Sequence, residues 1–426
     1  MNDSSQAAAA YEGWQQLVRK YSKPDLRKSI WQVINSFGGL LISWVILYYS
    51  LRVGYWLTLL LAIPAAGFLV RIFIIQHDCG HNSFFASRHA NDVVGIISSI
   101  FTFVPYFYWR KSHAIHHAHH AELEERGIGD VWTLTVDEYY TAPRWKRVMY
   151  RTYRNPVFLF VFAPTLYFVF LMRFPSSDAK LWTRQEVASF WWTNLMLAGK
   201  IALLSAIFGF GNTLLIVLPV IAVASCVGTW LFYVQHQFER TYWDHTPQWN
   251  YTLAAMHGSS YYKLPRVLQW MTGNIGFHHI HHLSPRIPNY RLQQVHEENP
   301  MLQQVTQLTL LGSLKTVSLT LWDEKRRRLV TFRGDCRRGE LRHQRLDAER
   351  FCTKKREQPR VGCSRFCFEF LPRKADQAGV GVPTTVTSGG PCGKSGFCSC
   401  TTGIRCRGGG RSAGIFRVAK GRRYTG

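Results

Sequence analysis

The residues of this chain best suited to chemistry are its histidines, most of which fall into three short clusters. The clusters read HDCGH from His77, HAIHHAHH from His113 and HHIHH from His278. A spacing of three or four residues places two side chains on the same face of a helix, one turn apart. Imidazole is a good ligand for iron, zinc, copper and nickel. The spacing therefore predicts that each cluster supplies ligands to a metal centre.

Eight histidines have this helical ligand spacing, which is more than one tetrahedral zinc ion can use. A lone histidine is more often an ordinary polar residue, but three such clusters in one chain favour ligation. The sequence therefore predicts two metal ions. The predicted ligands are His77, His81, His113, His116, His117, His278, His281 and His282.

His236 is a ninth candidate, because it ends a long apolar run in the string WLFYVQHQFE. It can be a metal ligand or a histidine at the membrane interface, and we favour the ligand. His119, His120 and His279 are adjacent to the candidates, and we expect them to support a ligand or to face solvent. The remaining histidines have no ligand spacing, and we expect ordinary surface positions for them: His89, His245, His257, His296 and His343.

Six apolar runs must position these clusters, at 33–50, 55–75, 93–109, 156–172, 195–210 and 213–234. A membrane-spanning helix needs about 20 apolar residues. The first two runs, joined by LRVG, and the last two, joined by GN, are predicted to form two helical hairpins. All clusters must meet on one membrane face. The two short runs, which contain Pro105 and Pro164, are therefore predicted to bend and lie in the interface or re-enter it.

These elements predict an all-α integral membrane protein with four transmembrane helices and a histidine-rich di-metal cap on the cytoplasmic face. The chain carries a net charge of +25, and many cations lie in the loops, as in PRWKRVMYRTYRNP from Pro143. This pattern is typical of cytoplasmic loops, and it would also suit docking of an acidic partner. We expect no nucleic-acid partner.

The composition divides the chain into three parts. Residues 1–32 form a polar segment with an amphipathic pattern, and residues 33–333 form the membrane domain. Residues 334–426 are basic and rich in Gly, Arg and Cys, without apolar periodicity. We expect this tail to be disordered, and a shifted reading frame would account for its composition. Its cysteines lack the paired spacing of a zinc site.

The three histidine boxes and their order resemble the membrane fatty acid desaturase superfamily. The likeness covers roughly residues 30–333 and extends to HDCGHNSFF, GIGDVWTLTVDEY, QHQFE and GSSYYKLPRVLQWMTGNIGFHHIHHLSPRIPNY. The H-x3-H first box resembles the acyl-lipid branch, which includes bacterial Δ12-type enzymes, more than the acyl-CoA branch, whose first box is H-x4-H. The tail resembles nothing in that family.

This resemblance implies a fold, a reaction and a site. It implies two non-haem iron ions and O2 as co-substrate for placing a cis double bond in an acyl chain, one linked to a membrane lipid. The eight box histidines would be the ligands and His236 the ninth. Asn274 is a candidate for a ligand acting through water.

Electrons must come from an external donor, ferredoxin or cytochrome b5, because the chain has neither an HPGG motif nor a C-x2-C-x2-C run.

Two other functions fit parts of the pattern. A sister di-iron hydroxylase or ketolase of acyl, alkane or carotenoid substrates could use the same boxes and would leave oxygen in its product. A metal transporter would place its ligands near the middle of the membrane in broken helices. Here the clusters lie at the ends of apolar runs, which favours a surface-facing centre.

Overall fold

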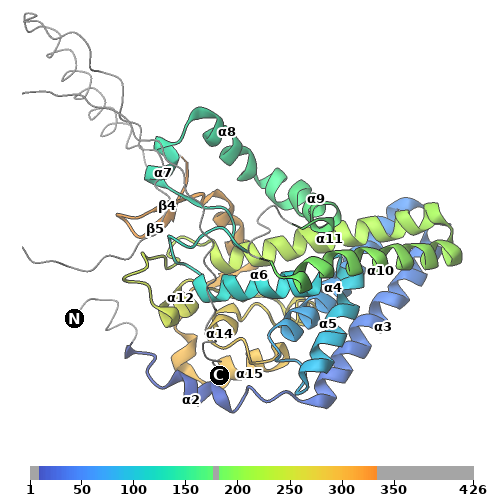
Figure 1. The fold of residues 1–426 in the computed structure, drawn as a ribbon, viewed down its shortest axis with the longest axis horizontal. Helices are drawn as coiled ribbons and strands as arrows, with labels where there is room; N and C mark the ends of the chain where they lie inside the picture. Colours follow the sequence, from blue (N-terminus) through green and yellow to red (C-terminus); the bar gives the residue numbers. More distant parts are fainter. Residues whose placement is uncertain (1–8, 176–181, 333–426) are drawn as a thin grey trace, which may run out of the picture. The chain divides into compact units, whose positions relative to one another are not determined.

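The computed structural model of the protein describes residues 9–175 and 182–332. The predicted tail at 334–426 and His343 lie outside these residues. Figure 1 shows that the long helices α3, α4, α10 and α11 run side by side, with the shorter elements gathered at one end of them.

The first predicted hairpin is confirmed. Helices α3 (Leu26–Ser50) and α4 (Tyr55–Gly80) are joined by residues 51–54. The Asp25 side chain caps α3 by accepting hydrogen bonds from the backbone N–H groups of Arg27 and Lys28. Helix α4 extends beyond its apolar run, so its last turn carries the first histidine cluster.

The second hairpin consists of α10 (Arg184–Phe208) and α11 (Phe210–His236). The turn between them is at Gly209, not at the predicted Gly211–Asn212. Gly209 has a φ of 85°, which glycine adopts without strain. Asn212 instead lies in the first turn of α11, where its side chain donates to the carbonyl of Phe208 at 2.9 Å.

The first of the two shorter apolar runs bends, as predicted, whereas the second follows a bend at its start. Helix α5 (Arg88–Thr102) meets α6 (Tyr106–His119) at 100°, and Pro105 lies in the break. Helix α8 (Arg144–Tyr153) meets the segment Phe158–Arg173 at 59°. That segment contains the π-helix η1 (Phe158–Phe162), α9 (Ala163–Val169) and η2 (Leu171–Arg173).

The sequence predicted the second bend at Pro164, but this bend falls at residues 154–157. No bend forms at Pro164, because it occupies the first turn of α9, where a proline removes no helical hydrogen bond. Within the described residues, four helices are long and apolar enough to cross a membrane, or six if each bent pair counts as one span.

The cap is built from short elements, including strands that an all-α fold does not have. Its helical elements are α2 (Trp14–Arg19), α7 (Val136–Thr141), α12 (Tyr251–His257), α13 (Arg266–Met271), α14 (His278–Leu283), α15 (Asn289–Glu298), η4 (Pro300–Gln303), α16 (Leu310–Ser313) and η5 (Leu314–Ser318). One sheet has the order β1 (Leu134–Thr135), β4 (Leu321–Asp323) and β5 (Arg328–Val330). In the other, β2 (Tyr261–Lys263) pairs in parallel with β3 (Gln307–Thr309).

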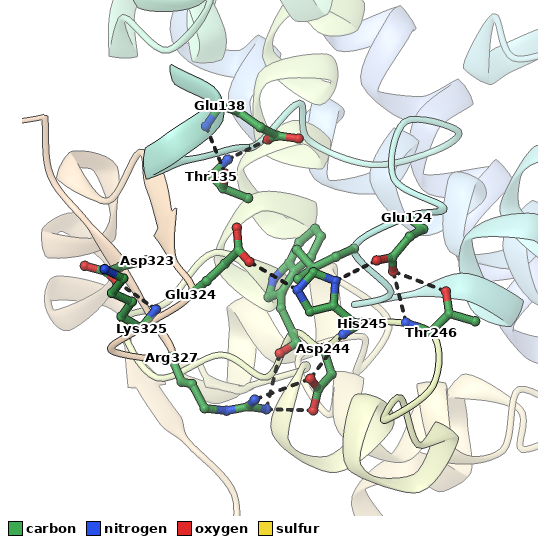
Figure 2. Close-up of polar contacts among 12 residues, drawn as sticks. Glu124, Thr135, Glu138, Asp244, His245, Thr246, Asp323, Glu324, Lys325 and Arg327 are labelled. Atoms are coloured by element: carbon green, nitrogen blue, oxygen red, sulfur yellow. Dashed lines mark hydrogen bonds and ion pairs between the residues drawn. The ribbon is translucent and has the colours of Figure 1, made fainter. Parts of the chain in front are cut away.

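A surface network fastens these cap segments to one another (Figure 2). His245 lies between two carboxylates, with Nδ1 2.6 Å from Glu124 and Nε2 3.1 Å from Glu324. The neighbouring Asp244 accepts from Arg327 at 2.8 Å. Because Glu124 follows α6, His245 follows α11 and Arg327 precedes β5, three distant parts of the chain are held together here.

Candidate metal centre

The ends of four helices bring all nine predicted histidine ligands together. The last turn of α4 carries His77, and His81 caps the same helix. Helix α6 supplies the second cluster, and α11 ends at His236. The short helix α14 supplies the third cluster.

The nine side chains form two groups. In the first group, one ring nitrogen of each member lies within 4.8 Å of those of the others. Its Nε2 atoms approach closely, at 3.1 Å between His113 and His117 and 3.0 Å between His117 and His281. The members of the first histidine group are His77, His81, His113, His117 and His281.

The second histidine group contains His116, His236 and His282, whose ring nitrogens also lie within 4.8 Å of one another. We include His278, because its Nε2 is 3.0 Å from Nε2 of His236.

Helical geometry explains this division. Residues four apart stay together, as in the pairs His113–His117 and His278–His282. The remaining ligand candidate of each of these boxes belongs to the other group: His116 lies in the second group and His281 in the first. Each of the two boxes therefore contributes to both groups.

The chemistry of these nitrogens fits a metal ion. Nε2 of His81, His116 and His282 is buried, and none has a hydrogen-bond partner among the described residues. Burial, followed by neighbouring imidazoles, holds the pKa of His81, His281 and His282 well below the usual value. The rings are therefore neutral near pH 7, which is the form that binds metals. Unpaired lone pairs facing one another in a buried site are stabilised by a cation.

Partners on the outer side of the rings orient three of these histidines. Nδ1 of His77 donates to Asp78 at 2.9 Å, and Asp78 in turn accepts from the backbone and side-chain nitrogens of Asn289 at 2.7 and 2.8 Å. Nδ1 of His236 donates to the carbonyl of Gly258 at 3.3 Å. Such bonds fix the tautomer, so that Nε2 presents its lone pair to the centre.

The third of these oriented histidines, His116, donates from Nδ1 to Asp130 at 2.6 Å. The supporting roles of Asp78, Asp130 and Gly258 were not predicted from the sequence. The adjacency of Asp78 to His77 was the one available signal, because the other two lie far from their partners in sequence.

The adjacent histidines occupy different environments. His120 is buried, its Nε2 is 2.9 Å from the Gly258 carbonyl, and its ring is 4.2 Å from that of His236. His279 is also buried, whereas the side chain of His119 is 43% exposed.

Of the histidines expected at the surface, His89 and His245 are exposed, but His257 and His296 are half-buried. Asn274 adopts a φ of 58° and donates to the carbonyl of Asn289 at 3.4 Å. It therefore lies beside Asn289, which donates to Asp78, the partner of His77. The role of Asn274 as a ligand through water remains a prediction.

A mainly apolar cavity of about 500 Å³ adjoins both groups. It is lined by His77 and His113 of the first group and by His278 of the second. Along α11 its lining extends from Gln235 to Ile221, which is roughly 21 Å at 1.5 Å per residue. The cavity thus leads from the histidines along the membrane helices. Its lining there includes Leu69, Phe73, Pro164, Met172, Ala224 and Gly228.

Long apolar helices, a buried centre of histidines able to hold metal and an apolar channel beside it define a class of helical membrane protein with a metal centre. A family model described as fatty acid desaturase matches residues 54–306. The chain therefore belongs to the fatty acid desaturase family.

Individual relatives agree with this assignment. A fatty acid desaturase of Bacillus subtilis is 44% identical over 317 residues, which cover 74% of this chain and 89% of that protein. An sn-1 oleoyl-lipid 12-desaturase of Synechocystis is 27% identical over 232 residues, covering 54% of this chain and 64% of that protein. A chloroplastic omega-3 fatty acid desaturase of Glycine max is 30% identical over 244 residues, covering 53% and 50%.

Proposed function

We propose that this protein uses O2 to place a cis double bond in the acyl chain of a membrane lipid. The observation that carries this proposal is the position of the two histidine groups beside the apolar cavity. The overall reaction converts a CH2–CH2 unit, O2, two electrons and two protons into CH=CH and two water molecules. The Synechocystis relative, named for an oleoyl-lipid substrate, supports a lipid-linked chain.

The two histidine groups would each hold one iron ion. The first group would supply His77, His81, His113, His117 and His281, and the second would supply His116, His236, His278 and His282. Iron bound there would supply the O2-derived oxidant that takes hydrogen from an unactivated chain. Asp78, Asp130 and the Gly258 carbonyl keep the ligand rings in the tautomer that this binding requires.

The role of the cavity is to hold an alkyl chain beside the histidines and away from water. The cavity wall is mostly carbon, so it has few groups that could hold water beside the reacting carbons. Trp109 stacks on His113 with ring centroids 4.5 Å apart and also lines the cavity. Trp109 therefore gives the cavity an apolar surface beside His113, which lines the same cavity.

Electrons would come from a separate acidic carrier, a ferredoxin or cytochrome b5, on the cytoplasmic side. That sidedness is testable with single cysteines in a background lacking the native ones. Gln248 is exposed on the cap, and Val53 lies in the link between α3 and α4 at the other end of the helices. Q248C should react with an impermeant reagent from the cytoplasmic side and V53C from the opposite side. Reaction of both from one side would overturn this topology.

Acyl-chain analysis after expression in a host without polyunsaturated lipids tests the reaction. We expect a new double bond at one position in chains still esterified to lipid, and none with H81A, which removes a first-group ligand. A hydroxyl or keto group in the product would instead identify a sister oxygenase. An unchanged acyl profile from iron-loaded protein supplied with a working electron donor would contradict the proposal.

A further inference from the structure

Helix α8 is attached to the cap through side chains of its last turn. Tyr150 is fully buried, donates to the carbonyl of Thr320 and accepts from the backbone N–H of Leu134 at 3.1 Å, and Arg151 donates to the hydroxyl of Tyr139 at 2.6 Å. Just after the helix, Arg154 donates to the side chain of Gln237 at 3.1 Å. These contacts fix the orientation of α8, so the direction of its exposed side chains is determined.

The outward face of α8 combines apolar side chains with free cations. Trp145, Val148 and Met149, at helical spacing, are 67%, 64% and 46% exposed. Beside them, Arg144 is exposed and Arg147 is half-buried, nearer the side that carries Tyr150. Neither guanidinium has a hydrogen-bond or ion-pair partner among the residues that the structure describes.

Exposed apolar side chains are also found beyond α8. After the 59° bend, Val157, Val161, Phe162 and Leu166 are exposed on the segment beside α11. In Figure 1, α8 lies at the cap end of that segment, and α9 runs alongside α11. Helix α8 thus lies where the apolar outer surface of the membrane helices meets the polar cap. Tryptophan is favoured at such a boundary.

We propose that α8 lies on the membrane surface and binds anionic phospholipid head groups through Arg144 and Arg147. Trp145, Val148 and Met149 insert at the boundary of the acyl region, as in other basic amphipathic helices at membranes. Anionic lipids concentrate around such exposed cations. Tyr153 of the same helix lines the cavity, so lipids bound to α8 are held near it.

An acidic electron carrier is the other partner that the two arginines could attract. The exposed apolar side chains of α8 decide between the two, because α8 adjoins the segment beside α11, whose side chains are also apolar and exposed, and a bilayer would cover both. The bilayer satisfies both the cations and the apolar side chains.

Photocrosslinking in nanodiscs tests this surface without iron or turnover, so its outcome is independent of the proposed reaction. A benzophenone amino acid replaces Val148, or Leu41 on α3 as the control position, which is 48% exposed. The nanodiscs contain equal amounts of phosphatidylglycerol and phosphatidylcholine, and adducts are identified by mass spectrometry. We expect lipid adducts at both positions, with phosphatidylglycerol enriched several-fold at Val148 relative to Leu41.

Charge variants test whether Arg144 and Arg147 cause the phosphatidylglycerol enrichment at Val148. R144Q/R147Q should reduce the ratio at Val148 to that at Leu41, whereas R144K/R147K should retain it. The matched control R240Q/K263Q removes two exposed cations elsewhere on the cap and should leave the ratio unchanged. Absence of lipid adducts at Val148, or enrichment that persists in R144Q/R147Q, would overturn the proposal. Adducts to an added acidic ferredoxin in place of lipid would assign the surface to the electron donor.

Discussion

Nδ1 of His116 lies 2.6 Å from Oδ1 of Asp130, although the two residues are 14 positions apart and only His116 belongs to a histidine box. The side chain of His116 is almost fully buried, and that of Asp130 is 11% exposed. The carboxylate fixes the proton on Nδ1 and leaves Nε2, which has no other partner, facing the second group. The loop after α6 therefore positions a proposed ligand that α6 carries.

Replacing Asp130 by Asn should weaken iron binding at the second group by about 10–100-fold, because the amide can no longer enforce the tautomer of His116. Iron titration of the purified apoprotein measures this. H119Q is a suitable control, since the exposed His119 pairs with Glu122 outside both groups. Equal iron affinity in D130N and wild type would show that Asp130 does not position His116.

His116 and His120 lie one helical turn apart but should respond differently to alanine. H116A should abolish product and iron at the second group. H120A should retain measurable activity, because Nε2 of His120 is engaged by the Gly258 carbonyl at 2.9 Å, while its ring packs against those of His116, His236 and His282. Acyl-chain analysis together with iron content checks both variants. Loss of iron in H120A as complete as in H116A would make His120 a ligand.

Gly228 offers a test of the cavity. A Cβ at this position would contact no heavy atom of the protein within 4 Å, and the residue lines the cavity. G228L should therefore fold normally but obstruct the channel, lowering product several-fold or restricting it to shorter chains. Gly199 on α10 has equal space and is exposed, so G199L should be neutral. Unchanged product from G228L across chain lengths would show that the chain does not pass α11 here.

The sequence predicted the parts of this architecture that depend on local pattern. Apolar run length gave the four long helices, and Pro105 marked a bend because a proline ring disfavours a continuous helix at the preceding residue. The bend predicted at Pro164 was wrong, because a proline in the first turn of a helix causes no break. The three- and four-residue spacing of the histidines predicted which of them lie together in the structure.

The contacts of Asp130 and Gly258 could not be predicted in this way. They join segments that only the tertiary fold brings together. The turn at Gly209 was missed for another reason, since Gly209 and the Gly211–Asn212 pair carry equally strong turn signals.

The His245 network should stabilise the cap most at mildly acidic pH. The hydrogen bond with His245 lowers the pKa of Glu124 to about 2, and the bonds with Glu124 and Glu324 raise the pKa of His245. The Glu124 contribution is therefore present above the ordinary carboxyl pKa and is lost as pH falls through about 2. The His245 contribution is present below the ordinary histidine pKa and is lost as pH rises through its raised value.

Thermal unfolding of wild type and H245Q at two pH values checks this dependence. We expect a small difference in unfolding midpoint at pH 6, because exposed ion pairs are weak, and a smaller one at pH 9. H89Q, which changes an exposed histidine outside the network, should show no difference at either pH. A wild-type advantage that grows from pH 6 to pH 9 would contradict the assigned charges.

The most direct test of the central claim is the iron content of purified protein, measured by mass spectrometry for wild type and two paired variants. H81A/H117A removes ligands of the first group alone, and H236A/H282A removes ligands of the second alone. The account predicts about two irons per chain in active wild type and about one in each variant, since O2 activation at imidazole ligands requires a redox metal. Active wild type filled with zinc, or either variant retaining the full iron content, would contradict it.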